Sequence, residues 1–448
     1  MPPDDGLAAE DPSTVVLPIL RERHQIEVFA ASTGQAVVWR DWIVPVREAH
    51  DFVWRHQAAP FDLVIYHLSN QPDHDYVWAY LWNYPGLVIL HDTRLHHARA
   101  RVLLERGTPR LHDYASELQF NHGLAPDVHQ ALGLMTGPTL GLWPMRGAVI
   151  RAARAVAVHT HGLVHDLSAE FPGIAFETIR LGVRDPGTHG DLRAASGSTH
   201  VRRRHGISGD AIVLAVFGPL TRSQRLPQIL GAFAAVHQVE PRVHLLLAGA
   251  VQDEYDVASD LSMKRITDHV TVTGALRESE LPEYMGAADI GLCLSWPTDG
   301  GLSPTWLRCL ASGLPTVVTE LEIQAHMPLL EPRNWDVRRR RGAATGRDPI
   351  AVSIGLRREQ QALRSTFEQL AHNRRLRDRI GRAARTWWSV HHTPEVMAND
   401  YELVIARAAA RPAPSTSVPA HLRPQVLEHT RALLSSIGVE LPPEMESR

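Results

Sequence analysis

The chain has 448 residues, 44% hydrophobic and 21% charged, so it is long enough for two or three globular domains that each bury a core. Its 46 basic and 49 acidic residues give a net charge of −3, which excludes an electrostatic case for binding nucleic acid or an anionic membrane. No apolar run approaches the roughly 18 residues of a membrane span, and the amino terminus lacks a signal-peptide pattern. We therefore expect a cytoplasmic protein without a transmembrane segment.

The first part of the chain alternates short apolar runs with helical patterns. A turn is expected at Gly6 and a helix over 14–20, but no strand precedes Gly6. Either the domain lacks its first strand or the natural chain begins upstream, and we favour the second because deleting a central strand would open the core. The continuous apolar runs predict a parallel sheet buried on both faces. Its strands are expected at 25–30, 62–67, 86–90 and 155–159, with helices over 93–133 and 147–154.

The same alternation then starts again, which predicts a second doubly wound domain. Its strands are expected at 211–217, 243–247, 270–273, 290–294 and 316–319. The segment 185–197 is rich in Gly and Ser and is expected to be the interdomain linker. The basic runs 202–204 and 338–341 are expected to be solvated loops.

The carboxyl-terminal part reads as helical after Arg357. A helix is expected over 399–410, crossing back to the first domain, and residues 411–420 form a Pro- and Ser-containing linker. Residues 422–439 predict an amphipathic helix that either docks on the body or binds a partner protein. We expect the fold to tolerate removal of the chain beyond Ala410. The predicted domains are 1–190, 191–398, the helix 399–410 and the tail 411–448.

Polar residues follow the strands of the first domain, where ligands bind in open α/β sheets. Asn70 and His74 come after one strand, and the pair His91-Asp92 follows the next. His96 and His97 lie close behind this pair, but the grouping matches no standard zinc spacing, so we predict no metal site. Cys293 and Cys309 also lack metal-ligand spacing and are expected to be small buried residues in a reducing compartment.

Two loops of the second domain have the composition of an anion site. Gly218 leads into Pro219, Arg222, Gln224 and Arg225 before a helical pattern, which suits a diphosphate. A second loop also precedes a helix, and its adjacent glycines expose backbone N–H groups to sugar hydroxyls or phosphate oxygens. It comprises Asp299, Gly300, Gly301, Leu302 and Ser303.

Four stretches in this order resemble the bacterial family-4 glycosyltransferases of the GT-B fold. The first is the strand over 86–90 that ends in His91-Asp92, and the second is the interdomain segment 155–159 with 179–183. The third is the turn from Gly218 to Arg225, and the fourth runs from Gly274 to Gly313. The resemblance covers roughly residues 6–410 and implies two Rossmann-like domains facing each other across a cleft, followed by a helical tail.

The resemblance implies that a sugar is transferred from a nucleotide diphosphate sugar to an acceptor hydroxyl with retention of configuration, without a cofactor or metal. It implies catalytic roles for His91, Asp92 and Arg225. The implied donor-binding residues are Gly218, Arg222, Gln224, Gly274, Asp299, Gly300, Gly301, Leu302 and Ser303. The implied acceptor-binding residues are Gly6, Asn70, His74, His96 and His97.

This chain also departs from the family at four positions. Gly301 and Cys309 stand where the resemblance places the two glutamates of the family's Glu-x7-Glu motif. Pro219 and Gln224 stand where it places an arginine and a lysine at the diphosphate turn. Arg225 or Arg222 could supply the missing charge. These substitutions support a second interpretation, in which the protein is a non-catalytic GT-B partner of an active glycosyltransferase.

Overall fold

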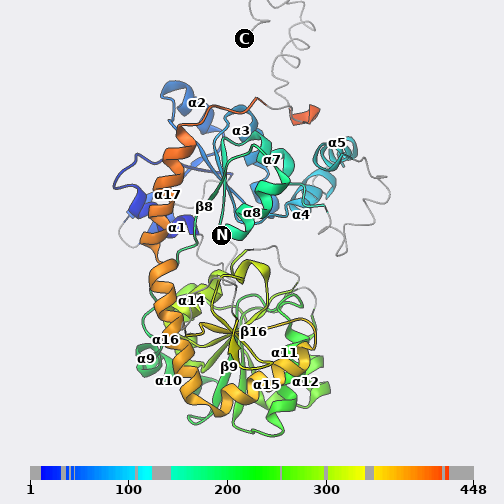
Figure 1. Ribbon diagram of the computed structural model, residues 1–448, viewed down its shortest axis with the longest axis vertical. Helices are drawn as coiled ribbons and strands as arrows, with labels where there is room; N and C mark the ends of the chain where they lie inside the picture. The colour runs from blue at the N-terminus through cyan, green and yellow to red at the C-terminus, as the bar shows by residue number, and fades with distance from the viewer. Residues whose placement is uncertain are drawn as a thin grey trace, which may run out of the picture. The chain divides into compact units, whose positions relative to one another are not determined.

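The computed structural model describes residues 12–31, 37–39, 42–44, 46–105, 109–123, 143–252, 255–296, 301–338, 348–415 and 419–422. Contacts divide the chain into two units, each built on a parallel or mainly parallel sheet with helices (Figure 1). The large unit comprises Met1–His24, His159–Leu163 and Ile179–Glu402, and the small unit comprises Gln25–Val158, Val164–Thr178 and Leu403–Arg448. The final long helix, α17 (Pro394–Ala409), therefore contributes residues to both units.

The small unit contains a four-stranded parallel sheet in the order β5-β6-β7-β8. The central strands β6 and β7 are fully buried, as their continuous apolar sequences Leu-Val-Ile-Leu and Ala-Val-Ala-Val predict. The expected strand near residue 28 instead pairs with β4 in a separate two-stranded sheet. The strands are β1 (Val28–Ala30), β2 (Val37–Trp39), β3 (Trp42–Val44), β4 (Val46–Glu48), β5 (Ile65–Leu68), β6 (Leu87–Leu90), β7 (Ala155–Val158) and β8 (Phe176–Thr178).

Helices precede and follow these strands along the chain, beginning with α1 (Pro12–Leu20) of the large unit. The expected helix over 93–133 is two α-helices separated by a π-helical turn, Arg101–Glu105, and its end beyond 123 lies outside the described residues, as does Gly6. The helices are α2 (Asp51–Ala58), α3 (Tyr76–Asn83), α4 (His96–Ala100), α5 (Leu111–His122), α7 (Gly147–Ala152) and α8 (His161–Glu170).

The large unit contains an eight-stranded sheet in the order β11-β10-β9-β12-β13-β16-β14-β15, and the five expected strands form one side of it. The last three strands were not predicted from the sequence. They have two to four residues each, and β15 pairs antiparallel with β14 at the end of the sheet. The strands are β9 (Ile212–Phe217), β10 (Val243–Ala248), β11 (Val270–Val272), β12 (Ile290–Cys293), β13 (Thr316–Thr319), β14 (Leu329–Glu331), β15 (Asp336–Val337) and β16 (Ala351–Ile354).

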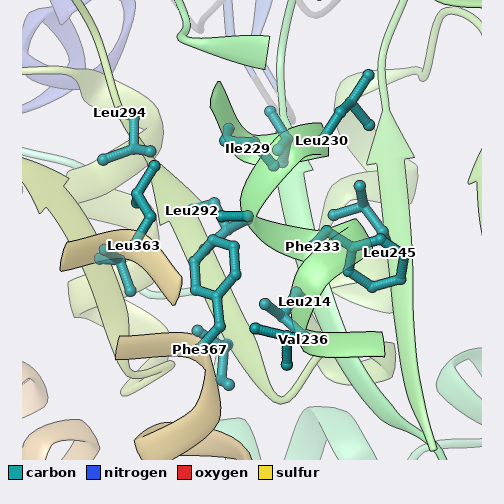
Figure 2. Packing of buried hydrophobic residues seen from close by; sticks show 14 of the residues in the cluster. Leu214, Ile229, Leu230, Phe233, Val236, Leu245, Leu292, Leu294, Leu363 and Phe367 are labelled. Atoms are coloured by element: carbon teal, nitrogen blue, oxygen red, sulfur yellow. The ribbon is translucent and has the colours of Figure 1, made fainter. Parts of the chain in front are cut away.

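The core of the large unit lies between this sheet and helices α11 (Leu226–His237) and α15 (Glu359–His372). Figure 2 shows Phe233 of α11 and Phe367 of α15 among the leucines of the neighbouring strands. Helices on this unit also include α12 (Val257–Lys264), α13 (Leu281–Ala287), α14 (Pro304–Ser312) and α16 (Arg374–His391). No helix within the described residues is long and apolar enough to cross a membrane.

The expected linker 185–197 is largely helical and part of the large unit. It forms α9 (His189–Ala194) and the start of α10 (Ser196–Arg204), which pack against α13. The basic run at the end of α10 is not a solvated loop, because Arg202 is only 8% exposed and its guanidinium bonds to the Asp289 carboxylate. Composition alone predicted a linker, because it does not show that Arg193 of this segment pairs with the Asp289 carboxylate 96 positions away.

Two histidines, buried His392 and half-buried His244, predict that the large unit loses stability in acid. Burial lowers the pKa of His244 and of His392 to about 4, while an unfolded histidine titrates near 6.5. Below pH 6.5 the unfolded chain therefore binds protons that the folded chain does not, so stability falls from pH 6.5 towards pH 4. His392 alone accounts for about 3 kcal/mol of the loss in unfolding free energy over this pH range.

Urea unfolding between pH 7 and pH 5 measures this loss. His392→Gln keeps a donor for the Leu181 carbonyl, which His392 Nδ1 contacts at 2.9 Å, but removes the titrating ring. The variant is expected to show a shallower acid limb than the natural chain. An identical pH dependence of the two proteins would contradict the prediction.

Candidate functional site

The strand order of the large unit reverses next to β9. From β9 the chain adds β10 and β11 on one side, and then returns to place β12 and β13 on the other. In open α/β sheets such a reversal leaves a crevice at the carboxyl ends of the two strands, here β9 and β12, because the connections leave in opposite directions. The loops that follow these two strands therefore form the candidate site of this unit.

The loop after β9 begins with a glycine in a backbone conformation that other residues rarely adopt. Gly218 has a φ of +105°, and a Cβ on Gly249 would lie 1.8 Å from the Gly218 carbonyl oxygen. The turn continues through a 2.7 Å hydrogen bond between the Thr221 and Ser223 hydroxyls and leads into α11. The Trp296 N–H, in the loop after β12, donates to the Ser223 carbonyl at 2.7 Å and joins the two loops. The turn thus places a helix amino terminus at the crevice.

The two arginines of this turn lie in different environments. Arg222 is exposed, and its guanidinium carbon lies 5.1 Å from the centre of the Tyr255 ring. Arg225 precedes α11 with a φ of +61° and forms a two-pronged ion pair with Glu359, with Nε 2.9 Å from Oε1. This hydrogen bonding to Glu359 raises the pKa of Arg225. Burial alone would raise the pKa of Asp260, but Lys264, Tyr255 and the nearby Arg222 charge lower it. Within the described residues Arg222 forms no ion pair, in contrast to Arg225.

Gln224 and Gly274 complete the part of the predicted donor set that precedes α14. The Gln224 side-chain oxygen is buried and has no hydrogen-bond partner in the part of the chain that the structure describes. Gly274 follows β11 with a φ of +75°, and its carbonyl accepts from the Thr273 hydroxyl at 2.7 Å. The buried oxygen of Gln224 leaves a hydrogen-bonding position in the turn for a ligand.

The second predicted loop is described from Gly301 onwards, and Asp299 and Gly300 lie outside the described residues. Leu302 is buried in the apolar cluster that contains Trp306. The Ser303 hydroxyl caps α14 by accepting from the Trp306 N–H at 3.3 Å. Leu302 and Ser303 thus anchor the loop, and their side chains are committed to packing and capping.

Cys309, at the second expected glutamate position, points into the core. Its side chain is fully buried with Leu276 and Met285, and its sulfur lies 4.0 Å from that of Cys293. The Cys293 contact and burial raise the pKa of the Cys309 thiol. Both cysteines are free, as the sequence predicts, although Cys293 is only half-buried.

In the small unit, His91 and Asp92 follow β6 and contact the end of β5. His91 Nε2 lies 3.0 Å from His67 Nδ1, and the two rings stack with centroids 5.2 Å apart. The Asp92 carboxylate accepts from the Asn70 N–H at 2.8 Å, and the Asn70 side chain accepts from the Ala98 N–H at the start of α4. His67 was not among the predicted site residues, although it ends the expected strand 62–67, beside the positions where ligands bind in such sheets.

Two of the other predicted acceptor-binding residues form hydrogen bonds within the protein. The His74 Nδ1 accepts from the Ser69 N–H at 3.1 Å, and buried His96 pairs with the Tyr114 hydroxyl at 2.7 Å. His97 is exposed on α4. Within the described residues, no three or more His, Cys, Asp or Glu side chains are grouped so that they could hold a metal ion.

Comparison with known proteins adds a family match over part of the large unit. Residues 198–327, which include the Gly218 turn, β12 and α14, match the family model described as Glycosyl transferases group 1. The chain is 31% identical over 117 residues to alpha-monoglucosyldiacylglycerol synthase of Streptococcus pneumoniae. This match spans 26% of the chain and 26% of the relative, about a quarter of each.

Solved structures match over most of the chain. WaaG, a glycosyltransferase involved in lipopolysaccharide biosynthesis, gives a TM-score of 0.55 at 13% identity, covering 90% of this chain and 96% of that one. Anabaena Alr3699/HepE in complex with UDP and glucose gives 0.59 at 12% identity, covering 90% and 98%. Sucrose-phosphate synthase from Thermosynechococcus elongatus gives 0.58 at 12% identity, covering 88% and 91%. These likenesses confirm the GT-B fold with two Rossmann-like domains.

Proposed function

We propose that this protein is a retaining, family-4-like glycosyltransferase that transfers a sugar from a nucleotide diphosphate sugar to an acceptor hydroxyl. The observation that carries the proposal is the crevice between β9 and β12, which lies inside the family match at 198–327 and presents the Gly218 turn. The similar HepE was solved with UDP and glucose, and the similar Streptococcus protein is a synthase of a glucosylated lipid. We propose the same class of donor for this chain, and a cytoplasmic location.

In this proposal the large unit binds the donor. The start of α11 and an arginine of the turn oppose the diphosphate charge, so in this proposal the reaction needs no metal or cofactor besides the donor and the acceptor. Residues 299–303 contact the donor sugar through backbone N–H groups. The small unit supplies His91 and Asp92 to the sugar and binds the acceptor near Asn70, His74, His96 and His97. An electrostatic donor at the leaving diphosphate contributes roughly 2.7–4 kcal/mol to transition-state stabilisation.

A screen of UDP- and GDP-sugars by thermal shift tests donor binding. Hits are then followed by NMR, which shows whether the sugar is released or transferred and whether the anomeric configuration is kept. We expect at least one nucleotide sugar to raise the melting temperature and to be turned over with retention. Failure of every nucleotide sugar to bind would reject the proposal.

One observation favours a second function, that of a catalytically degenerate partner protein. Arg225 is paired with Glu359, and Gly301 and Cys309 stand where the family resemblance places glutamates. A chain that binds a nucleotide sugar without hydrolysis or transfer would support this reading. The expected amphipathic helix over 422–439, which either docks on the body or binds a partner protein, lies outside the described residues beyond Leu422.

The two arginines of the turn give separable predictions. Arg222→Ala is expected to weaken UDP-sugar or GDP-sugar affinity about 10- to 150-fold, because a hydrogen bond to a charged group contributes roughly 1.5–3 kcal/mol. Its melting temperature should be unchanged, because the side chain is exposed. Arg225→Ala is expected instead to lower stability, since the buried Glu359 carboxylate loses its partner. Calorimetric titration and thermal melts distinguish the two, and the reverse pattern would make Arg225 the diphosphate ligand.

A further inference from the structure

Arg308 is a buried arginine that the fold leaves incompletely bonded. It lies on α14 and is 7% exposed. Its Nη2 lies 2.8 Å from the Glu278 carboxylate, but its Nη1 is buried without a hydrogen-bond partner in the described part of the chain. A buried donor without an acceptor costs about 1–3 kcal/mol, and more when it is charged. A buried donor without a partner therefore needs an explanation, and a ligand that accepts a hydrogen bond from it is one.

The position of Arg308 is close to the candidate site of the large unit. α14 begins at Pro304, after the loop that leaves β12, and Glu278 begins the short helical turn between β11 and α13. The next residue, Cys309, packs into the apolar cluster that also contains Phe217 at the end of β9. Arg308 therefore lies on the helix that borders the β9–β12 crevice.

The site needs a cation that the Gly218 turn only partly supplies. Pro219 and Gln224 are neutral, and Arg225 is already paired with Glu359. A guanidinium has five N–H donors arranged in a rigid fork, so one edge of Arg308 can hold Glu278 while the other donates to a ligand. An anionic oxygen satisfies such a donor best, because a charge-assisted hydrogen bond is roughly twice as strong as a neutral one.

We propose that Arg308 is a donor-binding residue whose Nη1 donates to an anionic oxygen of the nucleotide diphosphate, with Glu278 holding the guanidinium in place. This inference rests on the proposed function and deepens it, since it assigns a second cation to the same site. Glu278 is a positioning residue: its carboxylate is partly exposed and touches the ligand only through Arg308.

The test uses the full chain and the substitution Arg308→Met, with UDP, GDP and inorganic pyrophosphate as probes. Methionine fills much of the same volume without a polar atom, so the ligand-free variant should melt at the same temperature as the natural chain or higher. Affinity for the nucleotide diphosphate that the natural chain binds, and for pyrophosphate, should fall about 10- to 150-fold. Arg308→Lys should recover part of that loss, because it restores the charge without the fork.

Arg202→Met is the matched control, because Arg202 is equally buried but its guanidinium bonds to Asp289 and to several carbonyls. It should show the opposite pattern, with a lower melting temperature and unchanged affinity. If the natural chain binds a nucleotide diphosphate and Arg308→Met binds it equally well, the inference is wrong and the proposed function stands. If the natural chain binds none of the probes and no nucleotide sugar, both are wrong.

Discussion

Replacing Glu117 with alanine is expected to lower the free energy of unfolding of the small unit by about 3–5 kcal/mol. Glu117 is completely buried on α5, and its carboxylate pairs with the guanidinium of buried Arg99 through Nε at 3.0 Å and a second contact from Nη2. The guanidinium also lies 4.3 Å from the centre of the Trp78 ring. Without Glu117 the arginine keeps only part of its compensation, from Asp75, so a buried charge is left poorly paired.

Chemical denaturation measures this change in unfolding free energy, and calorimetry provides an independent measurement. Glu105→Ala is the matched control. Glu105 also pairs with an arginine, Arg101, at 2.9 Å, but both side chains are about half exposed. An exposed pair of this kind contributes roughly 0.3–0.5 kcal/mol, so the control should hardly change. Equal effects of the two substitutions would show that the Arg99–Glu117 pair is not a main determinant of this unit's stability.

The same carboxylate connects the tail to the small unit. His421 Nε2 lies 2.9 Å from Glu117 Oε1, beyond the Pro- and Ser-containing segment that was expected to be a flexible linker. Burial would raise the pKa of Glu117, but Arg99 and His421 outweigh it and hold that pKa below its usual range. We therefore expect truncation after Ala410 to destabilise the small unit, contrary to the prediction from sequence, and His421→Ala to reproduce part of the loss.

Asp289→Asn is expected to cost the large unit about 3–5 kcal/mol of unfolding free energy. Asp289 is 8% exposed, and its carboxylate accepts from Arg202 at 2.9 Å, from the Val213 N–H at 2.9 Å and from Arg193. The carboxylate thus joins α9 and α10 to the start of β9. The asparagine variant keeps the shape but removes the carboxylate charge, so the guanidinium of buried Arg202 is left with backbone carbonyls as its partners among the described residues.

Hydrogen exchange distinguishes this loss from global unfolding, because α9 and α10 should lose protection first. Asp348→Asn serves as the control, since Asp348 forms a 2.9 Å pair with Arg379 in which both side chains are largely exposed. A change smaller than about 1 kcal/mol in Asp289→Asn would contradict the assignment of Asp289 as the anchor of these helices.

The sequence by itself determined the elements whose signal is local. The continuous apolar runs that became β6, β7, β9 and β10 predict buried parallel strands, because a strand covered on both faces has no polar side to show. The positive φ at Gly218 is likewise local, since a strand that ends in glycine before a helix signals a tight turn. The restart of the pattern also predicted two doubly wound domains, and the family resemblance implied that they form the GT-B fold.

Only the tertiary structure decided how the charged and polar side chains of the candidate site are used. Arg225 meets Glu359 across 134 positions, and Arg202 meets Asp289 across 87. Cys309 and Arg308 are neighbours on one helix, yet Cys309 packs into the core, while Nη1 of Arg308 is buried with no acceptor among the residues that the structure describes. Such partners depend on which distant segments of the chain come together in the fold. The sequence shows that a residue is an arginine, but not whether its guanidinium pairs with a protein carboxylate or with a ligand.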